Sequence, residues 1–235
     1  MTGNREDKGE RHAHPSDLLG SVILGLNDGI VTTLVFVLSV SAASGKVRTT
    51  IIAGLSEMLA GGVAMFLGGY TAARATREAY HYQVDVERQE IRSEPEEERA
   101  EVTRLYRDKG FRGSLLEEIV RHVTSDPERW LRVMVRDELG APPDEGSPGW
   151  RVGGAIGGAF VAGALIPLLA YIWHLPDPAV LAIGLSIVAL VLTGAARSRF
   201  SRKPWWVSAL EMVAVGAAGS AAGILIGAGL HAAHQ

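Results

Sequence analysis

Residues 18–43 read LLGSVILGLNDGIVTTLVFVLSVSAA, and this stretch decides the fold class. Asp28 is its one charged residue, and the others are apolar, small or uncharged. A helix that crosses the roughly 30 Å hydrocarbon core of a bilayer needs about 20 predominantly apolar residues. The stretch therefore predicts a transmembrane helix with one carboxylate inside it.

Four more stretches of this kind follow, and the charged residues gather outside all five. We expect transmembrane helices at residues 18–43, 50–73, 152–173, 178–196 and 205–230. Charge is concentrated instead in residues 1–17, 74–145 and 197–203. The composition, 47% hydrophobic and 21% charged, would suit a soluble protein, but this segregation is what a bilayer imposes. The sequence predicts an all-α polytopic membrane protein, with its membrane regions at 18–73 and 150–230.

The charged segment 74–145 is predicted to form a helical, water-facing domain inserted between the second and third transmembrane helices. No break precedes Arg74, so the second span should continue as one helix to about Ser93. Pro95 suits the first turn of the next helix, and Asp126 before a proline is a helix-start signal. Further helices are expected at residues 95–109, 114–124 and 126–140, which gives a three- to four-helix domain.

The distribution of positive charge predicts which side of the membrane each segment faces. The loop 197–203 carries four positive charges and no negative ones. With five spans, this loop lies on the same side as the N-terminal segment 1–17 and the domain 74–145. Cytoplasmic loops carry an excess of Lys and Arg. We therefore expect these three segments in the cytosol and the C-terminal tail 231–235 outside.

Glycine repeats predict close packing between the transmembrane helices. Small residues spaced four apart let the backbones of two helices approach each other. Such repeats occur at Gly149, Gly153 and Gly157, and again at Gly219, Gly223 and Gly227.

Several functional classes are excluded by what the sequence lacks. There is no cysteine, which rules out disulfides, iron–sulfur clusters and thiolate metal sites. No phosphate-binding loop of an ATP-driven pump is present, and no hydrolase or dinucleotide-binding motif. The basic residues of the 74–145 domain are matched by acidic ones, which disfavours a nucleic-acid partner. We predict that the chain is not an enzyme and holds no prosthetic group.

Carboxylates inside the predicted spans are the first candidates for function. Asp28 lies ten residues into the first span, about 15 Å along a helix and close to the bilayer midplane. A carboxylate there costs at least about 2.5–3.5 kcal/mol. Glu57 and Met65 follow on the second, antiparallel span, so the three side chains should lie at successive depths. Two carboxylates and a thioether without a basic partner suit a divalent transition metal, although a protonated Asp28 and a packing Met65 are the alternatives. Glu211 in the fifth span suits either of two roles, as part of the pathway or as a hydrogen-bonding residue between packed helices.

Glutamates of the inserted domain form a second set of candidates. Residues three or four apart share one face of a helix. Such pairs are Glu87 with Glu90, Glu98 with Glu101, and Met134 with Glu138. Paired carboxylates on antiparallel helices can hold iron or manganese. Helices that interleave Glu with Arg are also typical solvated surfaces, and spacing alone favours that interpretation.

The two spans with carboxylates also carry motifs that resemble a known family. Residues 25–33 read GLNDGIVTT, and residues 54–65 read GLSEMLAGGVAM. Both are similar to motifs of the vacuolar iron transporter family, which includes the yeast-type proteins. The resemblance extends from about Leu18 to Leu230, and the chain resembles a bacterial member.

The resemblance implies a homodimer that exchanges cytosolic Fe²⁺, or Mn²⁺, Co²⁺ or Zn²⁺, for protons across the bacterial cytoplasmic membrane. It implies a pathway at the dimer interface, lined by the first two spans, where Asp28, Glu57 and Met65 match the family's positions. It also implies a cytosolic metal-binding domain with the ligands Glu87, Glu90, Glu98, Glu101, Met134 and Glu138. Val135 stands where eukaryotic members have a second methionine, which leaves the preference for Fe²⁺ over Mn²⁺ open.

Three functions are therefore weighed at this stage. The leading hypothesis is a proton-coupled exporter of divalent metal. The second is a membrane-anchored protein that buffers or senses metal without transport, against which the intramembrane carboxylates argue. The third is a ferroxidase-like enzyme, against which the lack of a histidine in the glutamate pairs argues.

Overall fold

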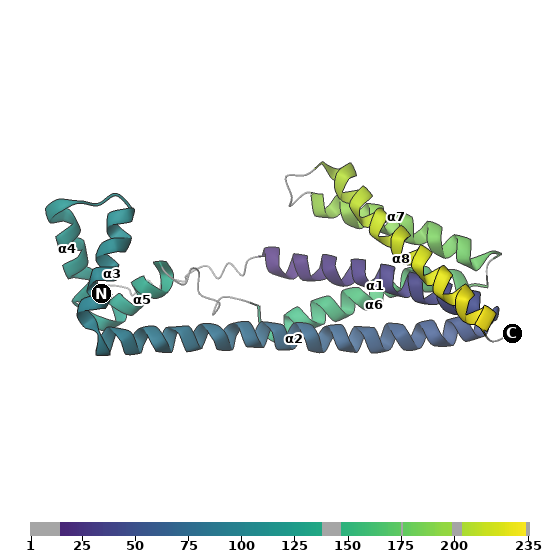
Figure 1. The fold of residues 1–235 in the computed structure, drawn as a ribbon, viewed down its shortest axis with the longest axis horizontal. Helices are drawn as coiled ribbons and strands as arrows, with labels where there is room; N and C mark the ends of the chain where they lie inside the picture. The colour runs from purple at the N-terminus through teal and green to yellow at the C-terminus, as the bar shows by residue number, and fades with distance from the viewer. Residues whose placement is uncertain (1–14, 138–146, 175, 199–203, 234–235) are drawn as a thin grey trace, which may run out of the picture. The chain divides into compact units, whose positions relative to one another are not determined.

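A computed structural model of the chain describes residues 15–137, 147–174, 176–198 and 204–233. All regular structure in these residues is α-helical, as Figure 1 shows, so the predicted all-α class is confirmed. The helices are α1 (Pro15–Ser44), α2 (Val47–Ser93), α3 (Pro95–Asp108), α4 (Gly113–Thr124), α5 (Pro127–Asp137), α6 (Gly149–Ile172), α7 (Pro178–Ser198) and α8 (Trp205–Ala233). Most of the predicted N-terminal segment 1–17 and of the positive loop 197–203 lies outside the described residues, as do residues 138–146 of the predicted 74–145 domain and its linker and the end of the tail 231–235.

Five of the described helices, α1, α2, α6, α7 and α8, are long and apolar enough to cross a membrane. They coincide with the five predicted spans, and α3, α4 and α5 lie between the second and third of them in sequence. The second span continues without interruption as the 47-residue α2. It ends just before Pro95 because the residue preceding a proline is pushed out of the helical region, and Glu94 has φ −134°.

The chain divides into two compact units. The membrane unit comprises residues 14–72 and 147–235, and the charged unit comprises residues 1–13 and 73–146. In the membrane unit, α1 packs against α6, α7 and α8. A buried apolar cluster fills the spaces between these helices and includes Leu34, Val37, Phe160, Leu168 and Tyr171.

Glycines bring the backbones of α1 and α2 into direct contact with α6. A Cβ added at Gly29 would lie 2.1 Å from the carbonyl oxygen of Phe160 on α6. One added at Gly157 would lie 2.7 Å from the carbonyl oxygen of Gly62 on α2. A Cβ at Gly223 of α8 would lie 2.8 Å from the carbonyl oxygen of Val35 on α1. The predicted close packing at the glycine repeats is confirmed for Gly157 and Gly223.

The charged unit has its own apolar core. Val102 of α3, Val120 of α4 and Trp130 of α5 meet there with residues of the second half of α2. Gly110 and Gly113 adopt positive φ values of 99° and 60° in the short connection between α3 and α4. These are backbone conformations that glycine adopts readily, so the chain can reverse within a few residues.

The helix-start signal at Asp126 is confirmed by its hydrogen bond. The Asp126 Oδ1 atom accepts the backbone N–H of Arg129 at 2.7 Å, which satisfies one of the free donors at the start of α5. This hydrogen bond is the largest cause that lowers the pKa of Asp126 below its usual value, with the positive charges of Arg129 and Arg132 as smaller causes.

The two neighbouring glycines of α6 give a matched test of the close packing. We expect Gly157→Ala to destabilise the protein, because overpacking a tight contact costs about 1–3 kcal/mol. Gly158→Ala is the control, since nothing lies within 4 Å of its added Cβ. Thermal unfolding of the purified protein in detergent measures both. Equal melting temperatures for the two variants would contradict the packing described.

The Asp126 cap predicts a pH-dependent local stability. The pKa of Asp126 is lower in the folded state than in the unfolded state. The stabilisation by the cap is therefore fully present at a pH above the pKa of the unfolded state, and it is lost as the pH falls through the pKa of the folded state. We expect α5 amides in Asp126→Ala to exchange hydrogen faster than in the wild type at neutral pH. The difference should vanish in strong acid, and Asp126→Asn should behave like the wild type near pH 7. A difference that persists unchanged in acid would contradict the charged cap.

Candidate functional site

The carboxylate of Glu57 on α2 is tied to α1 by a hydrogen bond. Thr33 of α1 is fully buried, and its Oγ1 donates to the Glu57 Oε2 atom at 2.7 Å. The other oxygen, Oε1, lies beside Gly61, where an added Cβ would come within 3.5 Å of it. The side chain of Glu57 is therefore held in one orientation between the two helices, and Oε1 is not used in this bond.

Asp28 of α1 adds a second carboxylate next to Glu57. The Thr32 hydroxyl donates to the Asp28 Oδ1 atom at 3.3 Å, and the charge of Asp28 acts directly on Glu57. Both carboxylates are half-buried. Among the residues that the structure describes, no Lys or Arg forms an ion pair with either of them. Two ionised carboxylates repel each other, and the repulsion is stronger where the dielectric constant is low. Binding of a proton or a cation relieves this repulsion.

Asn27 precedes Asp28 and supplies a further oxygen. Its Oδ1 atom is buried and accepts no hydrogen bond from the described residues. A buried carbonyl oxygen without a donor costs free energy, and a cation is one way to satisfy it. Sequence analysis did not select Asn27 or Thr33 as site residues. Their place within the GLNDGIVTT motif around Asp28 was the available signal.

Met65 lies on the same helix as Glu57 but does not join it. The two residues are eight positions apart, which is about 12 Å along α2. Met65 is half-buried and packs against the apolar cluster of the membrane unit. The structure thus brings Asp28 and Glu57 near each other, and Met65 lies at a different depth, against the apolar cluster.

The glutamates of the charged unit divide into buried and exposed residues. Glu87 on α2 and Glu98 on α3 are only 6% and 7% exposed. Each lies four positions before a buried apolar residue of its own helix, so both face the core of this unit. For these two residues the interpretation as solvated surface is wrong. Burying a carboxylate is costly unless it is paired or binds a cation.

The remaining candidates of this unit are arranged differently. Glu90 is exposed, and Glu101 is half-exposed and forms an ion pair with Arg104. Met134 is fully buried in the same apolar core that Glu87 and Glu98 face. Glu138 lies outside the described residues. Within the described part of the chain, no three Asp, Glu or His side chains converge closely enough to hold a metal ion.

Glu211 has a positive partner at the end of the neighbouring helix. Its Oε2 atom lies 4.0 Å from the Nη1 atom of Arg197 on α7, and α7 packs against α8. This ion pair favours a structural role for Glu211 over one beside Asp28 and Glu57.

The helices that carry these carboxylates lie within the part of the chain that matches a known protein family. The VIT family matches residues 19–228, which is most of the chain. The chain belongs to the VIT family. The match covers every helix that carries a candidate residue, and it confirms the resemblance found in the two motifs.

Individual relatives of this VIT-family protein are similar along nearly all of its length. It is 31% identical over 215 residues to "Vacuolar iron transporter 1" of Arabidopsis thaliana, covering 91% of this chain and 86% of the relative. It is 30% identical over 215 residues to "Vacuolar iron transporter 2" of Oryza sativa subsp. japonica, covering 91% and 87%. "Protein CCC1" of Saccharomyces cerevisiae is 26% identical over 159 residues, covering 66% and 48%. The two plant relatives are named as iron transporters, and the prediction that this chain is not an enzyme agrees with them.

Proposed function

We propose that this protein exports divalent metal, Fe²⁺ first and Mn²⁺, Co²⁺ or Zn²⁺ as further substrates, from the cytosol in exchange for protons. The observation that carries the proposal is the pair of carboxylates, Asp28 and Glu57, on two adjoining transmembrane helices without a basic partner among the described residues. Membership of the VIT family and similarity to proteins named as iron transporters support iron as the substrate.

The mechanism rests on competition between a metal ion and protons for the same oxygens. The Asp28 and Glu57 carboxylates bind a divalent cation when both are ionised, together with the buried Oδ1 of Asn27. Protonation removes the negative charge and the affinity for the cation. Because Thr33 holds the Glu57 Oε2 atom, Oε1 stays available to the ion. Met65 provides a softer ligand farther along α2 during passage of the ion.

A homodimer is supported by the exposed face of α2. Ala60, Ala64 and Gly68 are exposed at four-residue spacing, on the helix that carries Glu57. Large apolar residues, Leu59 and Val63 among them, are exposed on the same segment. Small residues at this spacing favour close contact between two transmembrane helices, so we assign this face to a second copy of the chain. The ion pathway then runs along the interface, beside α1 and α2 of both copies.

The segment 74–145 serves in this proposal as a cytosolic metal-binding domain that collects ions before transport. Glu87, Glu98 and Met134 form its buried part, and Glu90, Glu101 and Glu138 complete it when metal is bound. The N-terminus is placed in the cytosol and the C-terminus outside, because the positive loop 197–203 favours that orientation. The host membrane is the bacterial cytoplasmic membrane.

The second candidate function is buffering or sensing of metal without transport. The two buried carboxylates of the charged unit favour it, since they need no membrane to bind an ion. The intramembrane pair Asp28 and Glu57 argues against it, because an anchor needs no carboxylates between its helices.

Metal flux into proteoliposomes tests the transport proposal. We expect Fe²⁺ and Mn²⁺ uptake that a pH gradient stimulates and that falls to background in Asp28→Asn and in Glu57→Gln. Thr33→Val should reduce flux about 10–100-fold, as loss of a hydrogen-bonded partner of a metal ligand typically does. Thr193→Val on α7 is the matched control, because this hydroxyl donates to the carbonyl of Ala189 on its own helix.

Either of two results would count against transport through this pair. Gradient-driven flux at the wild-type rate in Asp28→Asn would remove the carboxylate pair from the mechanism. Metal binding by the whole protein with no flux at all would select the buffering or sensing function.

Metal binding to the charged unit is tested in an Asp28→Asn background, which removes the intramembrane site. We expect Glu98→Gln to lower the bound stoichiometry of Co²⁺, because a buried carboxylate is lost. Glu96→Gln is the matched control, since Glu96 is exposed on the same helix. Equilibrium dialysis of the full-length protein measures both, and equal binding by the two variants would contradict the domain's proposed role.

A further inference from the structure

A cationic pocket lies in the charged unit, and neither Glu87 nor Glu98 is part of its lining. It has a volume of about 920 Å³ and is lined by Lys109, Arg129, Arg132, Arg136 and Asp137. These four cations and one carboxylate give the lining a formal charge of +3. The volume is within the range of small-molecule sites, roughly 300–1,000 Å³.

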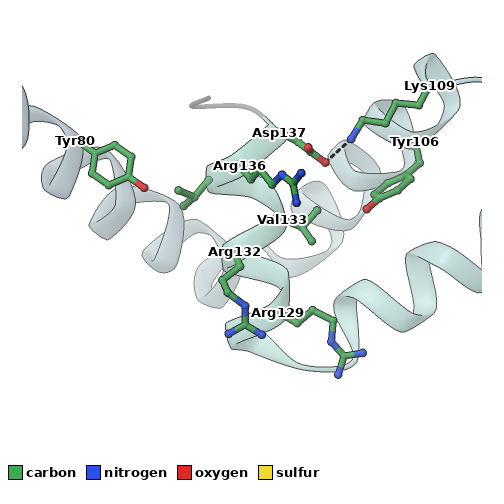
Figure 2. A pocket seen from close by; sticks show the side chains of 9 residues that line it. Tyr80, Tyr106, Lys109, Arg129, Arg132, Val133, Arg136 and Asp137 are labelled. Carbon is green, nitrogen blue, oxygen red and sulfur yellow. Dashed lines mark hydrogen bonds and ion pairs between the residues drawn. The ribbon is translucent and has the colours of Figure 1, made fainter. Parts of the chain in front are cut away.

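The three arginines form a row along one helix. Figure 2 shows Arg129, Arg132 and Arg136 following one another on α5. From Arg129 to Arg136 the row extends about 10 Å, at 1.5 Å per residue. A single phosphate or carboxylate cannot reach along such a row, whereas a chain of linked phosphates can. Each guanidinium can also bind phosphate oxygens through two parallel N–H groups.

The cations of the pocket differ in the ion pairs and hydrogen bonds that they already form with other residues. Lys109 forms an ion pair with Asp137 at 2.5 Å, and Arg129 hydrogen-bonds the ring of His122. Arg136 is exposed and forms no ion pair with any residue that the structure describes. Arg132 is exposed as well. Arg132 and Arg136 are therefore the two side chains most available to a ligand.

The rest of the pocket lining is apolar and aromatic. Val133 and Val135 lie between the arginines in sequence, and Tyr80 of α2 and Tyr106 of α3 complete the lining. Tyr106 is half-buried and already has the ammonium group of Lys109 4.8 Å from its ring centroid. An uncharged group attached to the anion can contact these apolar side chains, and the phenol of Tyr106 can donate a hydrogen bond to it.

We propose that this pocket binds a small ligand with two or more phosphate groups in a row, such as a nucleoside triphosphate. The phosphates lie along Arg132 and Arg136 and reach Lys109 across the pocket. The ligand thereby links the end of α3 to α5 and neutralises the repulsion between the cations. None of the described candidate metal ligands lines this pocket, and the proposal stands independently of metal transport.

The test measures binding of radiolabelled ATP to the purified full-length protein by equilibrium dialysis. EDTA is present, so that no divalent metal bridges the phosphates to the carboxylates. We expect saturable binding, weakened about a hundredfold in the double variant Arg132→Ala/Arg136→Ala, since each of the two charge-assisted contacts is worth about tenfold. Both side chains are exposed, so the variant should stay folded.

A second pair of arginines provides the matched control. Arg99 and Arg121 line a different pocket, of about 520 Å³, in the same unit, and both are exposed. Arg99→Ala/Arg121→Ala removes the same charge, and its affinity for ATP should stay at the wild-type level. An equal loss of ATP affinity in both double variants would show that ATP is attracted by net positive charge alone, and it would overturn the proposal. The absence of saturable ATP binding would overturn it as well.

Competition experiments identify the source of the phosphates. Inorganic triphosphate that displaces ATP at similar concentration indicates that the phosphate chain is recognised by itself. Nanodiscs that contain a phosphoinositide are compared with nanodiscs of phosphatidylcholine alone. Displacement of ATP by the first and not by the second indicates a lipid headgroup. Each of these results supports a polyphosphate site. Citrate that competes as well as triphosphate would overturn it, because its carboxylates are clustered on a short branched skeleton.

Discussion

Contact between helix backbones at glycine is the constraint on which the membrane unit depends. Gly29 lets α1 lie against the carbonyl of Phe160, and Gly157 lets α6 lie against the carbonyl of Gly62 on α2. Because α1 and α2 both close onto α6 in this way, their neighbouring faces meet. Thr33 can then reach Glu57, and Asp28 comes close enough to act on it. A glycine has no side chain to make van der Waals contacts with the facing helix. The short distance between the helix axes instead allows many contacts between backbone atoms.

Much of the fold could be predicted because local chemistry decides it. The long apolar stretches predicted the five spans, Pro95 predicted the end of α2, and Asp126 predicted the start of α5. The candidate site was predicted less completely, since its geometry depends on which helices face each other. Thr33 is 24 residues away from Glu57 in sequence, and no periodicity within one span indicates that pairing.

The glutamate pairs of the charged unit show the same limit. Spacing places Glu87 with Glu90 and Glu98 with Glu101 on shared faces, but only the first member of each pair is buried. The deciding partners are apolar residues one turn farther on, which direct Glu87 and Glu98 into the core. A buried carboxylate next to apolar residues breaks the local rule that charge faces water. Such violations are expected at functional sites.

The hydrogen bond between Thr33 and Glu57 has a consequence for the proposed exchange of protons at Glu57. A threonine hydroxyl is both a donor and an acceptor, and its hydrogen can rotate about the C–O bond. It donates to the carboxylate of an ionised Glu57 and can accept the hydrogen of a carboxylic acid. The change of charge at Glu57 is thus absorbed by turning one hydroxyl, with α1 and α2 at rest. Turning one hydroxyl moves no helix, so we expect the slow step of the proposed cycle to be the opening of the site to either side of the membrane, since such collective motions take microseconds or longer.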